Sequence, residues 1–357
     1  MKNLNLKEKI AQMLLVGIPN KNSIDGVLEL IKNNSIGGVI LYKNNYSDLD
    51  ELKNLITRLK DANKGNKHPL IIAIDQEGGR VNRLPREFNN SYSLNRMAKG
   101  SNDDISLYAD ATSKLLHDLG INMNFAPVLD LKMMKDSHAI GNRAISSDVN
   151  KVIEVSNLIV DSFKKNKVVS VIKHFPGQGS VKADSHFFLP IIKDYNEVAK
   201  KDLLTFINMI EKGIDAIMVG HIMIRKETSI YPATLSKKFI NNELRDRLKY
   251  NNVVMTDEMG MRSVSYLYGK RMSIIRAFRA NNDVICCKYS PRFIESIIDK
   301  VVKDIKKGRI SEDSINNSIK RIINMKDSYE FSDNVNFDNI DIDKYNRIID
   351  RIKSNIK

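Results

Sequence analysis

Apolar, β-branched runs alternate with amphipathic segments along most of this 357-residue chain, and this alternation limits its possible folds. Short runs of this composition are typical of buried strands, and the segments between them carry the helical spacing of apolar residues. About eight strand candidates occur, at residues 13–17, 36–42, 69–74, 122–129, 168–174, 215–220, 252–256 and 283–287. The pattern predicts βα units around a parallel sheet.

Helices are expected between these strands. They are predicted at residues 6–12, 47–62, 103–119, 149–166, 196–212, 236–248 and 271–280, with two more within 291–326. Ser47 is the expected N-cap of the second of them. No linker rich in Pro, Gly or Ser divides the chain, so we predict one barrel domain over residues 1–330. Residues 327–357 are charged and weakly periodic, and we expect residues 331–357 to form a helical extension packed outside the barrel.

Polar residues close several different apolar runs, and their positions separate two possible α/β folds. A doubly wound open sheet would spread these residues out, whereas a (β/α)8 TIM-type barrel gathers the carboxyl ends of its strands at one mouth. The sequence therefore predicts the barrel, with a site at its mouth. The residues concerned are Asp75, Asp130, Lys173, His174, His221 and Asp257.

The segment VVSVIKHFPGQGSVKADSHFFLP, residues 168–190, is the densest of these strand ends. An apolar run ends in Lys173 and His174, and the Pro/Gly-containing turn at residues 176–179 excludes a helix there. Three groups that can bond or exchange protons follow in the next loop: Asp184, Ser185 and His186. We interpret the segment as a strand end beside a polar loop.

A mouth with carboxylates, Lys, Arg and His suits a hydroxyl-rich substrate, because carboxylates accept hydrogen bonds from hydroxyl groups and the cations donate hydrogen bonds to them. Metal-binding spacings such as H-E-x-x-H are absent from the sequence, and Lys173 beside His174 would repel a cation, so neither a metal nor a cofactor is expected. Gly78 and Gly79 followed by Arg80 leave phosphate binding open as a weaker alternative.

Charge and hydropathy exclude other classes of function. The net charge is +14, but the basic residues are scattered and no nucleic-acid-binding motif accompanies them, so we expect no nucleic acid partner. No apolar stretch is long enough for a membrane span, and the N-terminus lacks a signal-peptide pattern, so we expect a cytoplasmic protein without a membrane partner. The adjacent Cys286 and Cys287 are poorly placed to bridge each other.

The segment KHFPGQGSVKADSH resembles the K-H-F-P-G-H-G…D-S-H signature of family 3 glycoside hydrolases, in particular the single-domain β-N-acetylglucosaminidases of peptidoglycan recycling. Further blocks resemble the family in the same order: EKIAQMLLVG, IDQEGGRVNRL, GINMNFAPVLD, IGNRAIS, YPATLSKKFI and VVMTDEMGM. The resemblance covers the chain up to about residue 330. Seven ordered blocks make it far more specific than one motif.

The resemblance implies a barrel fold and an exo-acting, retaining β-N-acetylglucosaminidase that removes terminal GlcNAc from muropeptides. Asp257 stands in the place of the nucleophile that forms a covalent glycosyl-enzyme. His186 resembles the general acid/base, oriented by Asp184, and a histidine with a pKa of ~6.5 can serve in that role near neutral pH. Residues that match binders of the terminal sugar's hydroxyls are Asp75, Arg143, Lys173 and His174.

Three residues depart from the family pattern: Gln178 replaces a histidine, Glu258 an aspartate and Asn281 a glycine. Gln178 cannot carry charge, so affinity or sugar preference near the turn could differ. A β-glucosidase or glycoside phosphorylase on the same scaffold, or a non-catalytic muropeptide-binding protein, remain as alternatives. Two strand-end residues also have structural interpretations: Asp130 as an anchor for Arg143 or a backbone amide, and His221 as a satisfied core histidine.

Overall fold

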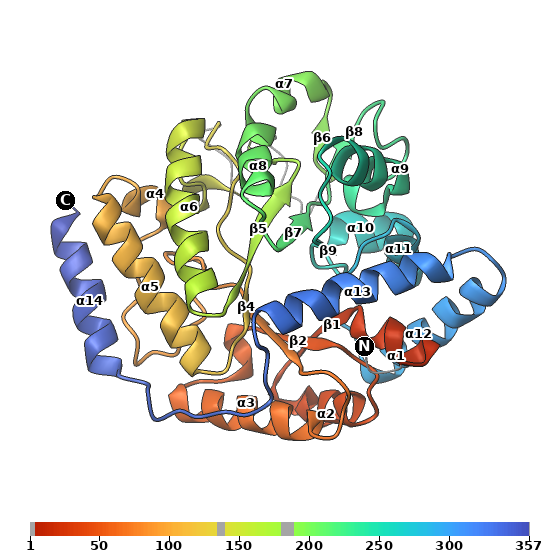
Figure 1. The fold of residues 1–357 in the computed structure, drawn as a ribbon, viewed down its shortest axis with the longest axis horizontal. Coiled ribbons are helices and arrows are strands. Elements are labelled where there is room, and N and C mark those ends of the chain that lie inside the picture. The colour runs from red at the N-terminus through yellow and green to blue at the C-terminus, as the bar shows by residue number, and fades with distance from the viewer. Residues whose placement is uncertain (1–3, 134–139, 180–188, 357) are drawn as a thin grey trace.

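Eight parallel strands form the centre of the protein in a computed structural model that describes residues 4–133, 140–179 and 189–356 (Figure 1). Their order in the sheet is β10-β1-β2-β3-β4-β5-β7-β9. The strands are β1 (Leu14–Gly17), β2 (Gly38–Leu41), β3 (Ile71–Ile74), β4 (Met123–Asn124), β5 (Val169–Phe175), β7 (Ala216–Val219), β9 (Val253–Thr256) and β10 (Ile285–Cys287). Every residue in these strands is buried, as expected of parallel strands that are covered on both faces.

The two ends of this sheet meet, so the sheet closes into a barrel. Met255 of β9 forms a parallel bridge with Val284, just before β10. The backbone N–H of Thr256 donates to Val284 O at 3.0 Å, and that of Asp283 donates to Val254 O at 2.7 Å. The predicted (β/α)8 barrel is confirmed, and the open doubly wound sheet is excluded.

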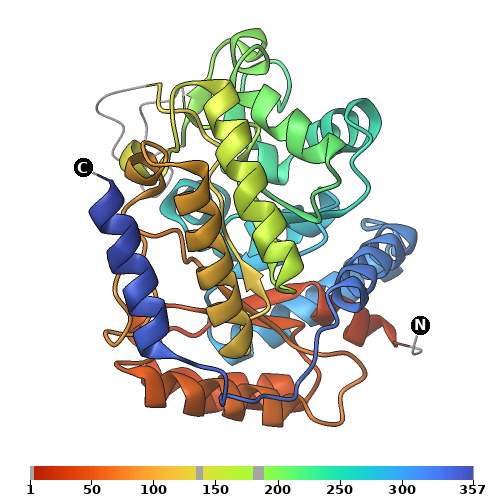
Figure 2. The ribbon, with the colours of Figure 1, turned by 60° about the vertical axis from the view of Figure 1, so that its left-hand side comes forward.

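Helices surround the barrel on the outside (Figures 1 and 2). They include α1 (Leu6–Gln12), α2 (Ile24–Lys32), α3 (Leu49–Asn63), α5 (Asn102–Asp118), α6 (Val149–Lys165), α8 (Asp202–Glu211), α11 (Lys270–Arg279), α12 (Pro291–Lys306) and α13 (Glu312–Ser328). Short elements lie in the connections: α4 (Leu94–Met97), α7 (Tyr195–Ala199), α9 (Lys237–Phe239), α10 (Arg262–Tyr268), and the 3-10 turns η1 (Lys21–Ser23), η2 (Lys43–Asn45), η3 (Gly141–Arg143) and η4 (Ala233–Leu235). A separate two-stranded sheet joins β6 (Ile191–Ile192) to β8 (Met223–Ile224).

The chain beyond α13 crosses the outside of the barrel and ends in α14 (Ile342–Asn355). Helix α14 packs against α5, and both views show the two helices side by side (Figures 1 and 2). Its apolar face is buried through Tyr345, Ile349 and Ile352. In the described ranges, no helix has both the length and the apolar character needed to cross a membrane.

The structure corrects several predicted helix and strand boundaries. Asp48, not Ser47, is the N-cap of α3, because its carboxylate accepts the Glu51 N–H at 3.0 Å. The helix predicted at 196–212 is two helices, α7 and α8, because Lys201 between them has a non-helical φ of −133°. The one predicted at 236–248 continues from α9 as a π-helix, η5 (Ile240–Arg247). Strand β4 is shorter than the run at 122–129, where Pro127 lacks an N–H.

Candidate active site

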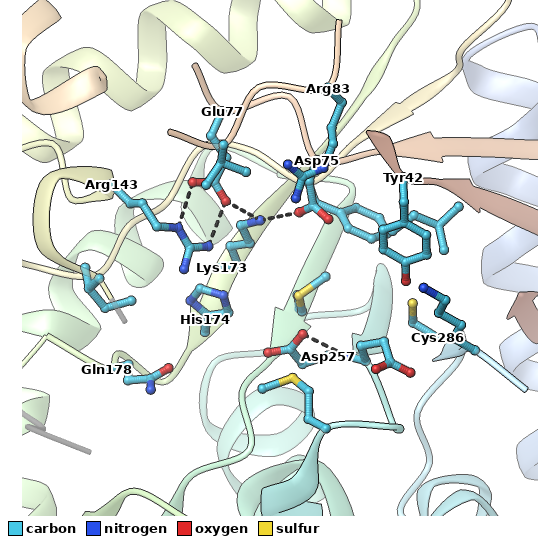
Figure 3. Close-up of a pocket in the computed structure, with 18 residues that line it drawn as sticks. Tyr42, Asp75, Glu77, Arg83, Arg143, Lys173, His174, Gln178, Asp257 and Cys286 are labelled. Atoms are coloured by element: carbon cyan, nitrogen blue, oxygen red, sulfur yellow. Dashed lines mark hydrogen bonds and ion pairs between the residues drawn. The ribbon is translucent and has the colours of Figure 1, made fainter. Parts of the chain in front are cut away.

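A cavity of about 300 Å³ lies at the carboxyl ends of the barrel strands, as the barrel prediction requires (Figure 3). Its size is at the lower end of the range for small-ligand sites, roughly 300–1,000 Å³. The polar residues that line it come from β5, from η3 and from the loops after β2, β3, β5, β9 and β10. They are Tyr42, Asp75, Glu77, Arg83, Arg143, Lys173, His174, Gln178, Asp257, Glu258 and Lys288.

One side of the cavity is a network of charged side chains, which we call the ion-paired wall: Asp75, Glu77, Arg143 and Lys173. Lys173 Nζ lies 2.7 Å from Asp75 Oδ1 and 2.6 Å from Glu77 Oε1. The Arg143 guanidinium donates to both oxygens of Glu77, through Nε at 2.8 Å and Nη2 at 2.7 Å (Figure 3). Two anions and two cations thus alternate along the wall, and this bidentate geometry fixes their orientation.

Burial makes this network electrostatically strong. The side chains of Lys173 and Glu77 are only 2% and 3% exposed. Burial alone would raise the pKa of Glu77, but the charges of Arg143 and Lys173 outweigh it and hold that pKa well below its usual range. Burial likewise would lower the pKa of Lys173, yet Asp75 and Glu77 raise it overall. Glu77, Lys173 and Arg143 are therefore charged at neutral pH, and the two cations are fixed hydrogen-bond donors.

Asp130 lies behind His174 and orients it. Its Oδ2 lies 2.6 Å from His174 Nδ1, and its Oδ1 accepts the backbone N–H of Gln178 at 2.7 Å. Asp130 is fully buried. Of the two structural alternatives for this residue, the backbone anchor is confirmed, whereas Arg143 pairs with Glu77 instead. Among the described residues no hydrogen bond is formed by Nε2, so this is the nitrogen through which His174 can contact a ligand.

Asp257 follows β9 and faces the cavity across from the ion-paired wall (Figure 3). Its Oδ1 accepts the backbone N–H of Glu258 at 2.7 Å. Burial acts to raise the pKa of Asp257, but His174, His221 and this N–H outweigh it, so the pKa is lowered. Asp257 is therefore an ionised carboxylate that faces the cavity, which is the state a nucleophile needs.

Glu258 has different neighbours: its charge acts on Tyr42 and Lys288, and the Lys288 backbone donates a hydrogen bond to it. Burial raises the pKa of Glu258, and the neighbouring charge of Asp257 adds to this, although Gly260 donates its N–H to the carboxylate at 2.8 Å. Lys288 Nζ lies 4.5 Å from the centre of the Tyr42 ring, a cation–π contact. Glu258 thus differs from Asp257 in its tendency to hold a proton.

His221 is a core histidine, as expected. It is fully buried, with Nε2 3.0 Å from Glu258 O and Nδ1 3.0 Å from Thr234 Oγ1. The carbonyl can only accept, so Nε2 carries the proton. His221 therefore fixes the backbone after Asp257 from behind.

The structure brings five of the predicted site residues to one cavity: Asp75, Arg143, Lys173, His174 and Asp257. Asp184 and His186 lie outside the described residues, so their proposed roles stay predictions.

Sequence reasoning missed Glu77, which joins two of the predicted residues. The available signal was its position two residues after Asp75 in the charged, Gly-rich loop that follows β3.

Within the described ranges, no group of three or more His, Cys, Asp or Glu side chains is arranged to hold a metal ion. The two cysteines are buried and free, with no disulfide between them. Cys286 lines the cavity, but burial raises the pKa of its thiol well above the ordinary value, so it is a poor nucleophile.

Comparison with known proteins gives a consistent result. Residues 5–325 match the family model described as the glycosyl hydrolase family 3 N-terminal domain. A β-hexosaminidase from Tolumonas auensis is 34% identical over 264 residues, which are 72% of this chain and 77% of that protein. A β-hexosaminidase from Psychromonas ingrahamii is 32% identical over 282 residues, 76% of this chain and 81% of that one.

A solved structure extends the similarity to nearly the whole chain. The family 3 β-N-acetylglucosaminidase from Paenibacillus sp. str. FPU-7 superposes with a TM-score of 0.92 at 28% sequence identity. The match covers 99% of this chain and 69% of that one.

Proposed function

The chain belongs to glycosyl hydrolase family 3, and we propose that it is a retaining β-N-acetylhexosaminidase that removes terminal GlcNAc. The observation that carries the proposal is Asp257: an ionised carboxylate that faces the ion-paired wall across a cavity of about 300 Å³. The relatives named β-hexosaminidase, and the superposed β-N-acetylglucosaminidase, support the choice of sugar.

In the proposed mechanism the ion-paired wall holds the terminal sugar. Asp75 accepts hydrogen bonds from sugar hydroxyls, while Lys173, Arg143 and His174 donate hydrogen bonds to sugar oxygens. Ion pairs within the wall already fix Asp75, Lys173 and Arg143, and Asp130 fixes His174, so substrate binding does not have to order these side chains. The sugar then presents its anomeric carbon to Asp257.

The reaction follows two displacements at that carbon. First, a carboxylate oxygen of Asp257 bonds to the anomeric carbon as the glycosidic C–O bond breaks, and His186 gives its proton to the leaving oxygen. Second, water gives a proton to His186 and its oxygen attacks the anomeric carbon, which releases the sugar and restores Asp257. Asp184 keeps the His186 ring oriented. The roles of His186 and Asp184 are proposed on the resemblance of the KHFPGQGSVKADSH segment.

The same resemblance supports the natural substrate that we propose, GlcNAc-containing muropeptides. On the same basis we propose a role in peptidoglycan recycling and a cytoplasmic location. We further propose that residues 1–330 are the catalytic barrel domain and residues 331–357 an extension to it.

The proposal is tested with an aryl β-GlcNAc substrate and the variants Asp257→Asn and His186→Ala. Asp257→Asn should lower kcat about 10⁴-fold or more, because no covalent intermediate can form. His186→Ala should lower it by roughly 10²–10⁴-fold and flatten the pH profile. Asp61→Asn, an exposed residue on α3, is the matched control. Parent rates in both site variants would overturn the assignment.

Two further measurements separate the alternatives. A GlcNAc analogue that keeps the 2-acetamido group and carries fluorine elsewhere on the ring should label the peptide that contains Asp257, whereas a non-catalytic binding protein forms no covalent adduct. The assay is repeated with added phosphate and with aryl β-glucoside. Phosphate-dependent release of sugar 1-phosphate would show a phosphorylase, and faster turnover of the glucoside would show a β-glucosidase.

A further inference from the structure

Helix α14 lies far from the cavity in sequence, yet a short series of contacts connects the two. The first link is the hairpin that carries Glu77. Gly78 and Val81 form an antiparallel bridge, and the N–H groups of Glu77 and Gly78 both donate to Val81 O, at 3.0 and 3.1 Å. Val81 itself lines the cavity. The position of this hairpin therefore sets the position of Glu77, which binds both Arg143 and Lys173.

The hairpin is held in turn by residues 90–93. Gly79 N–H donates to Ser91 O at 3.2 Å, and Asn90 Nδ2 donates to Gly79 O at 2.7 Å. The packing is close as well as bonded: a Cβ added to Gly78, whose φ is +86°, would meet Ser91 Oγ at 2.4 Å. The tip of the Glu77 hairpin thus follows the backbone of residues 90 and 91.

Helix α14 holds the residues just before these. The Asn346 amide spans three residues of backbone, since its Oδ1 accepts the Asn89 N–H at 2.7 Å and its Nδ2 donates to Glu87 O at 2.9 Å. Asp350 accepts from Asn89 Nδ2 through both oxygens at 2.9 Å. Between these polar contacts the buried rings of Phe88 and Tyr345 pack edge to face, 5.5 Å apart.

We propose that α14 is a positioning element of the active site, in which Asn346 and Asp350 hold residues 87–91 and thereby the Glu77 hairpin. Neither residue touches the cavity, so they act through Asn89, Gly79 and finally Glu77. The extension at residues 331–357 is then required for substrate binding and is not only a cover for the barrel. The kinetic part of this inference rests on the proposed glycosidase function.

Point variants test the proposal, because removing α14 would expose the buried Tyr345, Ile349 and Ile352. Asn346→Ala should raise KM for aryl β-GlcNAc about five- to tenfold, the effect of losing one or two hydrogen bonds, with a smaller change in kcat. Asp350→Ala should act in the same direction, and Asp350→Asn, which keeps an acceptor oxygen, should retain the parent KM. The exposed neighbour Arg347→Ala is the control and should match the parent.

Amide hydrogen exchange provides a readout that needs no substrate. In Asn346→Ala the amides of Gly78, Gly79 and Val81 should exchange about tenfold faster than in the parent, while those of β5 stay unchanged. Parent exchange rates and parent KM in both Asn346→Ala and Asp350→Ala would overturn the proposal. If the parent itself does not hydrolyse the substrate, the proposed function fails, and the exchange measurement alone decides the role of α14.

Discussion

The cavity has two kinds of polar group around it, and they differ in what they are bonded to. In the ion-paired wall, Glu77 and Lys173 are bonded to opposite charges on the protein. Elsewhere around the cavity, and among the described residues, the buried Gln178 Nε2 has no hydrogen-bond partner. The Lys288 ammonium lies over the Tyr42 ring and interacts with Glu258 through its charge, but it has no carboxylate oxygen within 4.0 Å among those residues. The wall is thus ordered before substrate arrives, whereas Gln178 and Lys288 have bonding capacity left for a ligand.

Glu77→Gln breaks the ordered side and should have the largest effect. The variant keeps the shape of the side chain but leaves Arg143 and Lys173 without the anion that they share. Losing one partner of a buried pair costs about 3–5 kcal/mol, so we expect a fall of this size in the free energy of unfolding. We also expect kcat/KM to fall about 100-fold or more, because two sugar-binding cations lose their orientation. Urea denaturation and aryl β-GlcNAc kinetics measure these effects.

The control for this prediction is Glu51→Gln on the surface. Glu51 pairs with Lys21, but both side chains are more than 40% exposed, and water screens such a pair so that it contributes little to stability. Equal losses of stability in the two variants would show that the wall is no stronger than a surface ion pair.

Asp202, a buried carboxyl without a cation bonded to it in the described structure, sharpens the contrast with Glu77. It is 1% exposed, and burial together with the nearby charge of Asp130 raises the pKa of Asp202 to about 7. In the unfolded chain the Asp202 carboxyl ionises near pH ~4, so between pH ~4 and ~7 this group binds fewer protons in the unfolded chain than in the folded one. Stability from this group should therefore fall as pH rises through that window and level off above it.

Asp202→Asn removes this dependence, because the amide stays neutral and its Oδ1 can still accept the Leu131 N–H, now 3.2 Å away. Parent and variant should be equally stable near pH ~4, and by pH ~8 the variant should be more stable by a few kcal/mol. Urea denaturation across this range is the measurement. Unfolding free energies that stay parallel across the range would contradict the prediction.

The sequence predicted the barrel and half of the cavity for a local reason. Each strand end is visible as an apolar run followed by a polar residue, and barrel topology brings those ends together without any knowledge of loops. That rule found Asp75, Lys173, His174 and Asp257. Glu77 was missed because its meaning depends on Arg143, which is 66 residues away and meets it only after folding. The division of residues 196–212 into α7 and α8 depends likewise on the backbone of Lys201, which no periodicity reveals.

Other elements show why family likeness and local signals complement each other. Asn281, which stands where the family pattern has glycine, has a φ of +65°, so the backbone there needs a residue that tolerates the left-handed region. The hydrogen bonds from α14 to residues 87–89 had no sequence signal, because Asn346 and Asp350 look like ordinary polar residues of an amphipathic helix. Loop and extension contacts of this kind are fixed by tertiary packing.

Gln178→Met tests a cavity residue that lies outside the ion-paired wall, and it has the smallest expected effect. Gln178 and Gln76 are both 2% exposed, but Gln76 is satisfied: its Nε2 donates to Asn82 at 2.9 Å and its Oε1 accepts the Arg83 N–H at 2.7 Å. Replacing a satisfied buried amide by methionine should cost about 1–3 kcal/mol, so Gln76→Met should destabilise the protein. Gln178→Met removes an Nε2 group that has no partner in the described structure, so no protein group loses a hydrogen bond to it, and the variant should match or exceed the parent in stability. Its kcat/KM should fall about fivefold, because a ligand contact is lost. The measurements are thermal unfolding of both variants and the kinetics of Gln178→Met. If Gln178 has only a structural role, Gln178→Met will lose stability as Gln76→Met does and will keep its activity.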